Sequence, residues 1–199
     1  MFIGHYAVAL AAKPAAKHTS LGTLVAAAVA LDLLWPFFVF AGLETLKISP
    51  GSTAVMPVDF LHMPYSHSLL AALGWSVLAA FAGGKIIGSL VFSHWLLDAA
   101  SHRPDMPLTF AADSAKVGLG LWFSLPWTLA VEGAMLTAGG WLAVKSGVPF
   151  NRLKWFLGVL AVLELAAVFG PPPPSELAMA AGGLAQLTFV WWAKKIDPC

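Results

Sequence analysis

Charged residues are scarce in this 199-residue chain. Lys, Arg, Asp and Glu make up 11% of it and hydrophobic residues 59%, whereas soluble domains carry about 25% charged residues. This composition predicts a polytopic membrane protein folded as an all-α helical bundle. The formal net charge is only +1, so the chain lacks the basic excess of a nucleic-acid-binding protein and no nucleic-acid partner is expected.

Cysteine is nearly absent, because the single Cys199 is the last residue. That excludes an internal disulfide framework and any cysteine-rich zinc or iron–sulfur site. The chain start also lacks a basic region before its apolar run, so a cleavable signal peptide is not expected. There is no internal repeat, and the one low-complexity stretch, the prolines at 171–174, predicts a stiff loop.

Apolar segments dominate what is present. Residues 2–12 are predicted to form a short helix packed inside the bundle, because a membrane span needs about 20 residues. The predicted spans, with kinks expected at Pro36 and Pro126, are 21–41, 66–83, 86–102, 117–144, 155–169 and 176–193. The sequence thus predicts a single transmembrane domain (1–199) of about five to six membrane helices plus the N-terminal helix. Residues 42–64 are predicted to be a loop with room for a short helix.

Basic residues give this bundle a direction. The connections on one side hold Lys13, Lys17, Lys85, Lys145, Arg152, Lys154, Lys194 and Lys195, and those on the other side hold Lys47, Arg103 and Lys116. Positive charge concentrates on the cytoplasmic side of membrane proteins. A cytoplasmic C-terminus is therefore predicted.

His94, Asp98 and His102 are spaced four residues apart. On a helix this spacing places two imidazoles and a carboxylate on one face. Pro104 disfavours helix at Arg103, so the helix is predicted to end at about His102. Histidine and carboxylate at i and i+4 suit a metal ion, although a helix end with solvated polar groups is the alternative.

The predicted topology brings further candidates to the same depth, near the outer leaflet. The candidate metal ligands are His5, Asp32, His67, His94, Asp98 and His102, with Asp105 just beyond them. Each has a structural alternative: Asp32 as an acceptor between helices, His5 as a polar terminus, and His67 as a first-turn residue after a Ser66 cap. His102 and Asp105 are equally compatible with ligation, with supporting the ligands, or with contacting substrate beside Arg103. His18 and His62 are predicted not to be ligands, and structural roles are expected for Glu132 and Glu164.

These residues resemble the pattern of the YdjM-like family of inner-membrane metal-dependent hydrolases. The matching elements, all within about residues 1–110, are Gly4-His5, Asp32, Ser66-His67-Ser68, and His94 with Asp98. Many members carry Asp-x-Asp-His where this chain has Asp32-Leu33-Leu34-Trp35. The family is distantly similar to the zinc-dependent phospholipase C and P1 nuclease group. The resemblance implies an all-helical fold, a bacterial inner-membrane location, a His/Asp zinc cluster and phosphoester hydrolysis. The chain is accordingly divided into residues 1–110, which are expected to hold the metal site, and residues 117–193, which are expected to supply additional membrane helices.

The leading functional hypothesis is a membrane-embedded hydrolase with one or two zinc ions facing the periplasmic side. Zinc would lower the pKa of a bound water to about 7, Asp98 or Asp105 would act as general base, and Arg103 would hold an anionic phosphate. Membrane lipids are the expected partners and a lipid-like phosphoester the expected substrate. Two alternatives stay open: a transporter or channel component that passes protons or metal ions, and a non-catalytic membrane scaffold. The oligomeric state does not follow from the sequence.

Overall fold

Helices make up most of the computed structural model, which describes residues 1–197; Cys199 lies outside the described residues. They are α1 (Ile3–Ala11), α2 (Leu21–Ala28), α3 (Ala30–Phe40), α4 (Pro64–His67), α5 (Leu69–Gly83), α6 (Lys85–Ser101), α7 (Leu125–Lys145), α8 (Phe150–Phe169), α9 (Glu176–Leu184) and α10 (Gln186–Ile196), with short 3-10 helices at Lys13–Ala15 (η1) and Leu121–Phe123 (η2). The all-α prediction is confirmed at this level.

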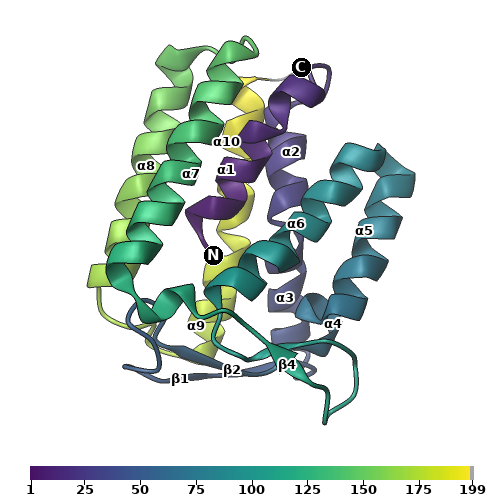
Figure 1. Cartoon of the computed structure of the whole chain (residues 1–199), viewed down its shortest axis with the longest axis vertical. Coiled ribbons are helices and arrows are strands. Elements are labelled where there is room, and N and C mark those ends of the chain that lie inside the picture. The colour runs from purple at the N-terminus through teal and green to yellow at the C-terminus, as the bar shows by residue number, and fades with distance from the viewer. Residues whose placement is uncertain (198–199) are drawn as a thin grey trace.

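The structure also contains two small antiparallel sheets, which the all-α prediction did not include. β1 (Thr45–Ile48) pairs with β2 (Val58–His62), and β3 (Met106–Pro107) pairs with β4 (Lys116–Val117). The hairpin of β1 and β2 occupies most of the segment predicted to be a loop. Both sheets lie at one end of the helical bundle (Figure 1). The other end carries the α1–α2 turn, the α7–α8 connection and the end of α10.

Helix boundaries follow local signals. Ser20, Ser68 and Ser175 cap α2, α5 and α9, each accepting a hydrogen bond from the backbone N–H three residues on, which satisfies a donor that the first turn leaves free. Gly84, at φ 88°, separates α5 from α6. Ser66 is not the cap that the sequence suggested, because α4 already begins at Pro64.

The predicted spans differ from the observed helices in four places. Residues 66–83 are divided at Ser68 between α4 and α5. Residues 117–144 begin with β4 and η2 and are helical only from Leu125, so Pro126 lies in the first turn of α7 and not at a kink. Residues 21–41 are broken at Val29 into α2 and α3, which bend by 52°, although the kink was expected at Pro36. Residues 176–193 are divided at Ala185 between α9 and α10. Within the described chain, no single helix is both long and apolar enough to cross a membrane. The bent pair α2–α3, taken together, has the length and composition of a membrane span.

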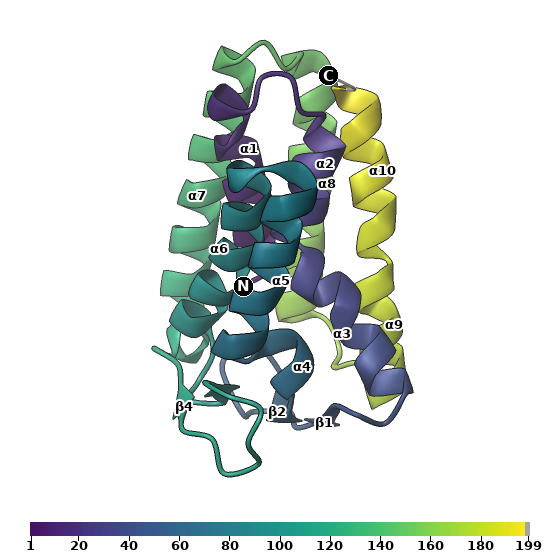
Figure 2. The same ribbon diagram turned by 90° about the vertical axis from the view of Figure 1, so that its right-hand side faces the viewer.

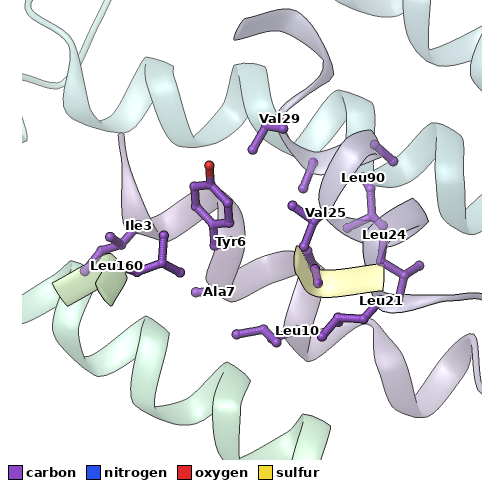
Figure 3. Close-up of a cluster of buried hydrophobic side chains, with 14 of the residues drawn as sticks. Ile3, Tyr6, Ala7, Leu10, Leu21, Leu24, Val25, Val29, Leu90 and Leu160 are labelled. Atoms are coloured by element: carbon purple, nitrogen blue, oxygen red, sulfur yellow. The ribbon is translucent and has the colours of Figure 1, made fainter. Parts of the chain in front are cut away.

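The main core is built around α1. Tyr6, Ala7 and Leu10 of this helix lie against buried side chains of α2, with Leu90 of α6 and Leu160 of α8 nearby (Figure 3). On the α7 side, the backbone of α1 passes close to Gly139, where an added Cβ would come within 2.3 Å of the Ala7 carbonyl oxygen. The α5–α6 hairpin stands on another side of α1 and α2 (Figure 2). The first helix is therefore enclosed, and the polar residues it carries are buried with it.

Candidate metal centre

Five ionisable side chains meet where α1, α3, α4 and α6 come together. They form two overlapping groups, His5 with His94 and Asp98, and Asp32 with His67 and His94. Within each group the potential ligand atoms all lie within 4.8 Å of one another. His94 belongs to both groups, so the five residues make one cluster.

Helix α6 supplies two members because its period places residues four apart on one face. His94 Nε2 lies 3.0 Å from Asp98 Oδ2, and both residues are buried. The helix ends at Ser101, and His102 is already extended, with ψ 151°. The predicted end of this helix is confirmed.

Asp98 is the central carboxylate of the cluster. Its Oδ1 lies 3.1 Å from His5 Nε2 and 2.6 Å from the amino nitrogen of Met1. Its Oδ2 faces both His94 Nε2 and, at 3.6 Å, His67 Nε2. One carboxylate thus contacts all three imidazoles, each brought by a different helix.

Asp32 completes the cluster from α3. Its Oδ1 lies 3.5 Å from His67 Nε2 and 3.5 Å from His94 Nε2. Its other oxygen, Oδ2, accepts a hydrogen bond of 3.0 Å from Gln186 Nε2, and Gln186 Oε1 in turn accepts one of 3.1 Å from the Tyr6 hydroxyl. Neither Gln186 nor Tyr6 was predicted from the sequence. No local pattern indicates that Gln186 contacts Asp32, which lies 154 positions away in the chain.

The outer nitrogen of His94 is held by the backbone. Nδ1 lies 2.8 Å from the carbonyl oxygen of Ala28, in the last turn of α2. A carbonyl only accepts, so Nδ1 carries the proton and the lone pair of a neutral ring sits on Nε2, facing the cluster. A hydrogen bond of this kind orients most metal-binding histidines. The contact lies next to the break at Val29, and a side chain that engages a helix carbonyl is a recognised cause of such a bend.

His67 is held by a chain of two hydrogen bonds. Its Nδ1 lies 2.6 Å from Ser66 Oγ, which lies 2.6 Å from Glu44 Oε2. The carboxylate accepts from the hydroxyl, so the hydroxyl accepts from Nδ1 and the His67 lone pair is directed to Nε2. Glu44 is buried and also accepts the backbone N–H groups of Tyr65 and Ser66. Glu44 was not identified from the sequence; an acidic residue in a loop carries no signal of burial.

The donor set fits a metal ion. Among the residues the structure describes, the buried nitrogens His5 Nδ1 and His94 Nε2 have no hydrogen-bond partner, and such orphaned atoms are costly unless a ligand satisfies them. Imidazole nitrogens with carboxylate oxygens are a donor set that zinc accepts.

His102, Asp105 and Arg103 form a separate polar chain. His102 Nδ1 lies 2.9 Å from Asp105 Oδ1, and Arg103 pairs with Asp105 at 3.3 Å and with Asp59 at 2.9 Å. His102 belongs to neither group of the cluster. Its role as a metal ligand, and the catalytic roles of Asp98, Asp105 and Arg103, stay predictions.

A cavity of about 600 Å³ adjoins the cluster. Asp32, His67, Asp98 and His102 contribute to its wall, so four of the predicted site residues face one space. Glu132 also lines it, and its Oε2 accepts the backbone N–H groups of Phe2 and Gly4 at 3.0 Å each. That contact ties the start of α1 to α7.

Comparisons with models of known protein families, with curated proteins and with solved structures found no match.

Proposed function

We propose that this chain is a metal-dependent hydrolase that acts on a phosphoester at a membrane, with zinc as the metal. One observation carries the proposal: three buried imidazoles and two carboxylates, brought by four helices, direct their potential ligand atoms at one another. Burying so many ionisable groups together is costly unless they are paired or coordinate a metal.

The ligands proposed are His5, Asp32, His67, His94 and Asp98. Zinc held there would supply a Lewis acid and lower the pKa of a coordinated water to about 7. The protein's own contribution is to fix the ligands, through Ala28 behind His94 and through Ser66 and Glu44 behind His67. Ligand-supporting contacts of this kind are typically worth 10- to 100-fold in metal affinity or activity.

Proton transfer is assigned to groups outside the ligand set. Because Asp98 contacts three imidazoles, it is proposed as a ligand and not as the base. The Asp105 carboxylate accepts the Nδ1 proton of His102, and His102 faces the cavity that adjoins the cluster. The His102–Asp105 pair is therefore the proposed acid–base group.

The membrane location is proposed from composition and from the arrangement of the helix ends. The chain is 59% hydrophobic, and large apolar side chains such as Phe81, Leu119 and Phe169 are more than 60% exposed. The connections richest in lysine and arginine leave the bundle at the end opposite the sheets (Figure 1). The C-terminal end of α10 would then be cytoplasmic and the cavity would lie toward the periplasmic side.

The metal content of the purified protein tests this proposal. We expect stoichiometric zinc in the wild type and its loss in the double variant His94→Ala/Asp98→Ala. His18→Ala is the matched control, because His18 is exposed in the turn after η1. All proteins are purified without chelator and offered zinc. A wild type that binds no metal, or a double variant that keeps it, would overturn the proposal.

A further inference from the structure

We propose that the cavity beside the metal centre binds an apolar chain, and that Gly182 of α9 leaves the room for it. The inference deepens the proposed function, on which it rests for the phosphoester end of the substrate. It names the substrate class as an amphiphile whose ester end lies at the cluster and whose apolar chain fills the rest of the cavity.

The cavity has a size typical of a binding site. Its volume of about 600 Å³ falls within the usual range of 300–1,000 Å³ for small-molecule pockets. The ionisable lining residues are Asp32, His67, Asp98, His102, Glu132 and Glu164. Most of the remaining lining is apolar, and about half of it comes from α8, α9 and the connection between them. One cavity therefore joins a polar end, suited to an ester, to an apolar wall.

The prolines at 171–174 make the apolar wall a poor hydrogen-bonding surface. All four line the cavity, and proline has no backbone N–H to donate. Leu163, Val168 and Met179 add only apolar atoms. A peptide or sugar placed there would find no proline N–H for its acceptor groups, at a cost, whereas an alkyl chain has no polar group to satisfy.

Two adjacent glycines of α9 serve different purposes. A Cβ on Gly183 would lie 2.9 Å from Pro36 Cγ and 3.2 Å from the Asp32 carbonyl oxygen, so this glycine lets α9 pack against the helix that carries Asp32. A Cβ on Gly182 would meet no heavy atom within 4 Å, yet Gly182 lines the cavity. Glycine inside a helix costs about 0.5–1 kcal/mol relative to alanine. No close packing accounts for that cost at Gly182, and the same holds for Gly133 and Gly158, but of these three glycines only Gly182 lines the cavity.

Tryptophan fluorescence can detect such a chain. Trp35 and Trp122 line the cavity, and bromine quenches indole fluorescence on contact. The probe is 10-bromodecan-1-ol, which carries a chain but no phosphate. We expect saturable quenching in the wild type and its loss in the double variant Trp35→Phe/Trp122→Phe. All variants are measured in the same lipid or detergent, so that partitioning of the probe into it is equal for all.

Gly182→Leu is the decisive variant and Gly158→Leu its matched control. Gly158 is a glycine of α8 that also has no heavy atom within 4 Å of an added Cβ and does not line the cavity. We expect Gly182→Leu to weaken probe binding about tenfold or more and Gly158→Leu to leave it unchanged. Gly182→Ala is a smaller change that favours helix, and it is expected to weaken probe binding less. It keeps the test decisive if the leucine variant does not fold. Equal binding in wild type and both Gly182 variants, or saturable quenching that survives loss of both tryptophans, would overturn the inference.

The probe separates this inference from the proposed function because it needs no metal. The same titration is run on wild-type protein stripped of metal with a chelator, where we expect the apolar chain to bind as it does to the zinc-loaded protein. Gly182-dependent quenching in a protein that binds no zinc would refute the hydrolase and leave the chain site standing. Stoichiometric zinc without saturable quenching would refute the chain site alone.

Discussion

His5 and His94 stack face to face, with 3.7 Å between their ring centroids and 2° between their planes. Their Nε2 atoms approach opposite oxygens of one carboxylate, Oδ1 and Oδ2 of Asp98, at 3.1 and 3.0 Å. The two imidazoles come from residues 89 positions apart. This stack divides the cluster into a His5 side and a side on which His94, His67 and Asp32 converge.

The two sides predict different metal contents for single variants. His5→Ala leaves Asp32, His67, His94 and Asp98 in place, which is enough donors for one zinc ion. We expect this variant to retain one ion per chain and His94→Ala to lose metal, because His94 alone belongs to both groups. Mass spectrometry of the purified variants measures the stoichiometry. Wild-type metal content in His94→Ala would contradict the assignment.

Ser66 is expected to set the metal affinity through His67. Ser66→Ala removes the hydroxyl that joins His67 Nδ1 to Glu44 but leaves the contacts of Glu44 with the α4 backbone. Loss of one such supporting contact should weaken zinc binding about 10- to 100-fold. Competition with a chromophoric chelator measures the Kd. Ser175→Ala, which removes the hydroxyl that caps α9, is the control, and equal Kd values in both variants would refute the role of Ser66.

Tyr6→Phe should destabilise the protein. The Tyr6 hydroxyl donates to Gln186 Oε1 inside the core, and removing it leaves a buried acceptor unsatisfied, at a cost of about 1–3 kcal/mol. Tyr65→Phe is the matched control, because Tyr65 is 40% exposed and its change should be nearly neutral. Denaturant unfolding with a helicity readout measures both. A Tyr6→Phe variant as stable as Tyr65→Phe would show that the bond to Gln186 contributes nothing.

Gly139→Ala should separate α1 from α7. Its methyl group would meet the Ala7 carbonyl at 2.3 Å, and backbone cannot yield as a side chain can, so we expect a loss of about 1–3 kcal/mol from overpacking. In the same helix, Gly133→Ala has open space at its Cβ and should stabilise by up to about 1 kcal/mol through helix propensity. Thermal unfolding distinguishes the two. Because α1 carries His5, zinc affinity should fall in Gly139→Ala and stay constant in Gly133→Ala; similar behaviour of both variants would contradict the close packing.

The sequence by itself determined the helical class and the pairing of His94 with Asp98. Apolar segments bounded by prolines, glycines and capping serines indicate helices wherever they occur, and a spacing of four residues is sufficient to place two side chains on one helix face. The end of α6 followed from Pro104 in the same way. These features depend only on neighbours in the chain.

The tertiary structure alone decided which distant residues support the cluster. Glu44 and Gln186 carry no local pattern. They become partners of His67 and Asp32 only because Glu44, directly before β1, meets the start of α4 and because α9, which packs against α3, leads into α10. The sequence predicted a kink at Pro36, whereas the helix breaks at Val29. The hydrogen bond from His94 to Ala28 lies next to this break and joins two different helices, so residues 21–41 alone do not indicate it. Periodicity sets which face a residue occupies, whereas long-range packing sets what that face meets.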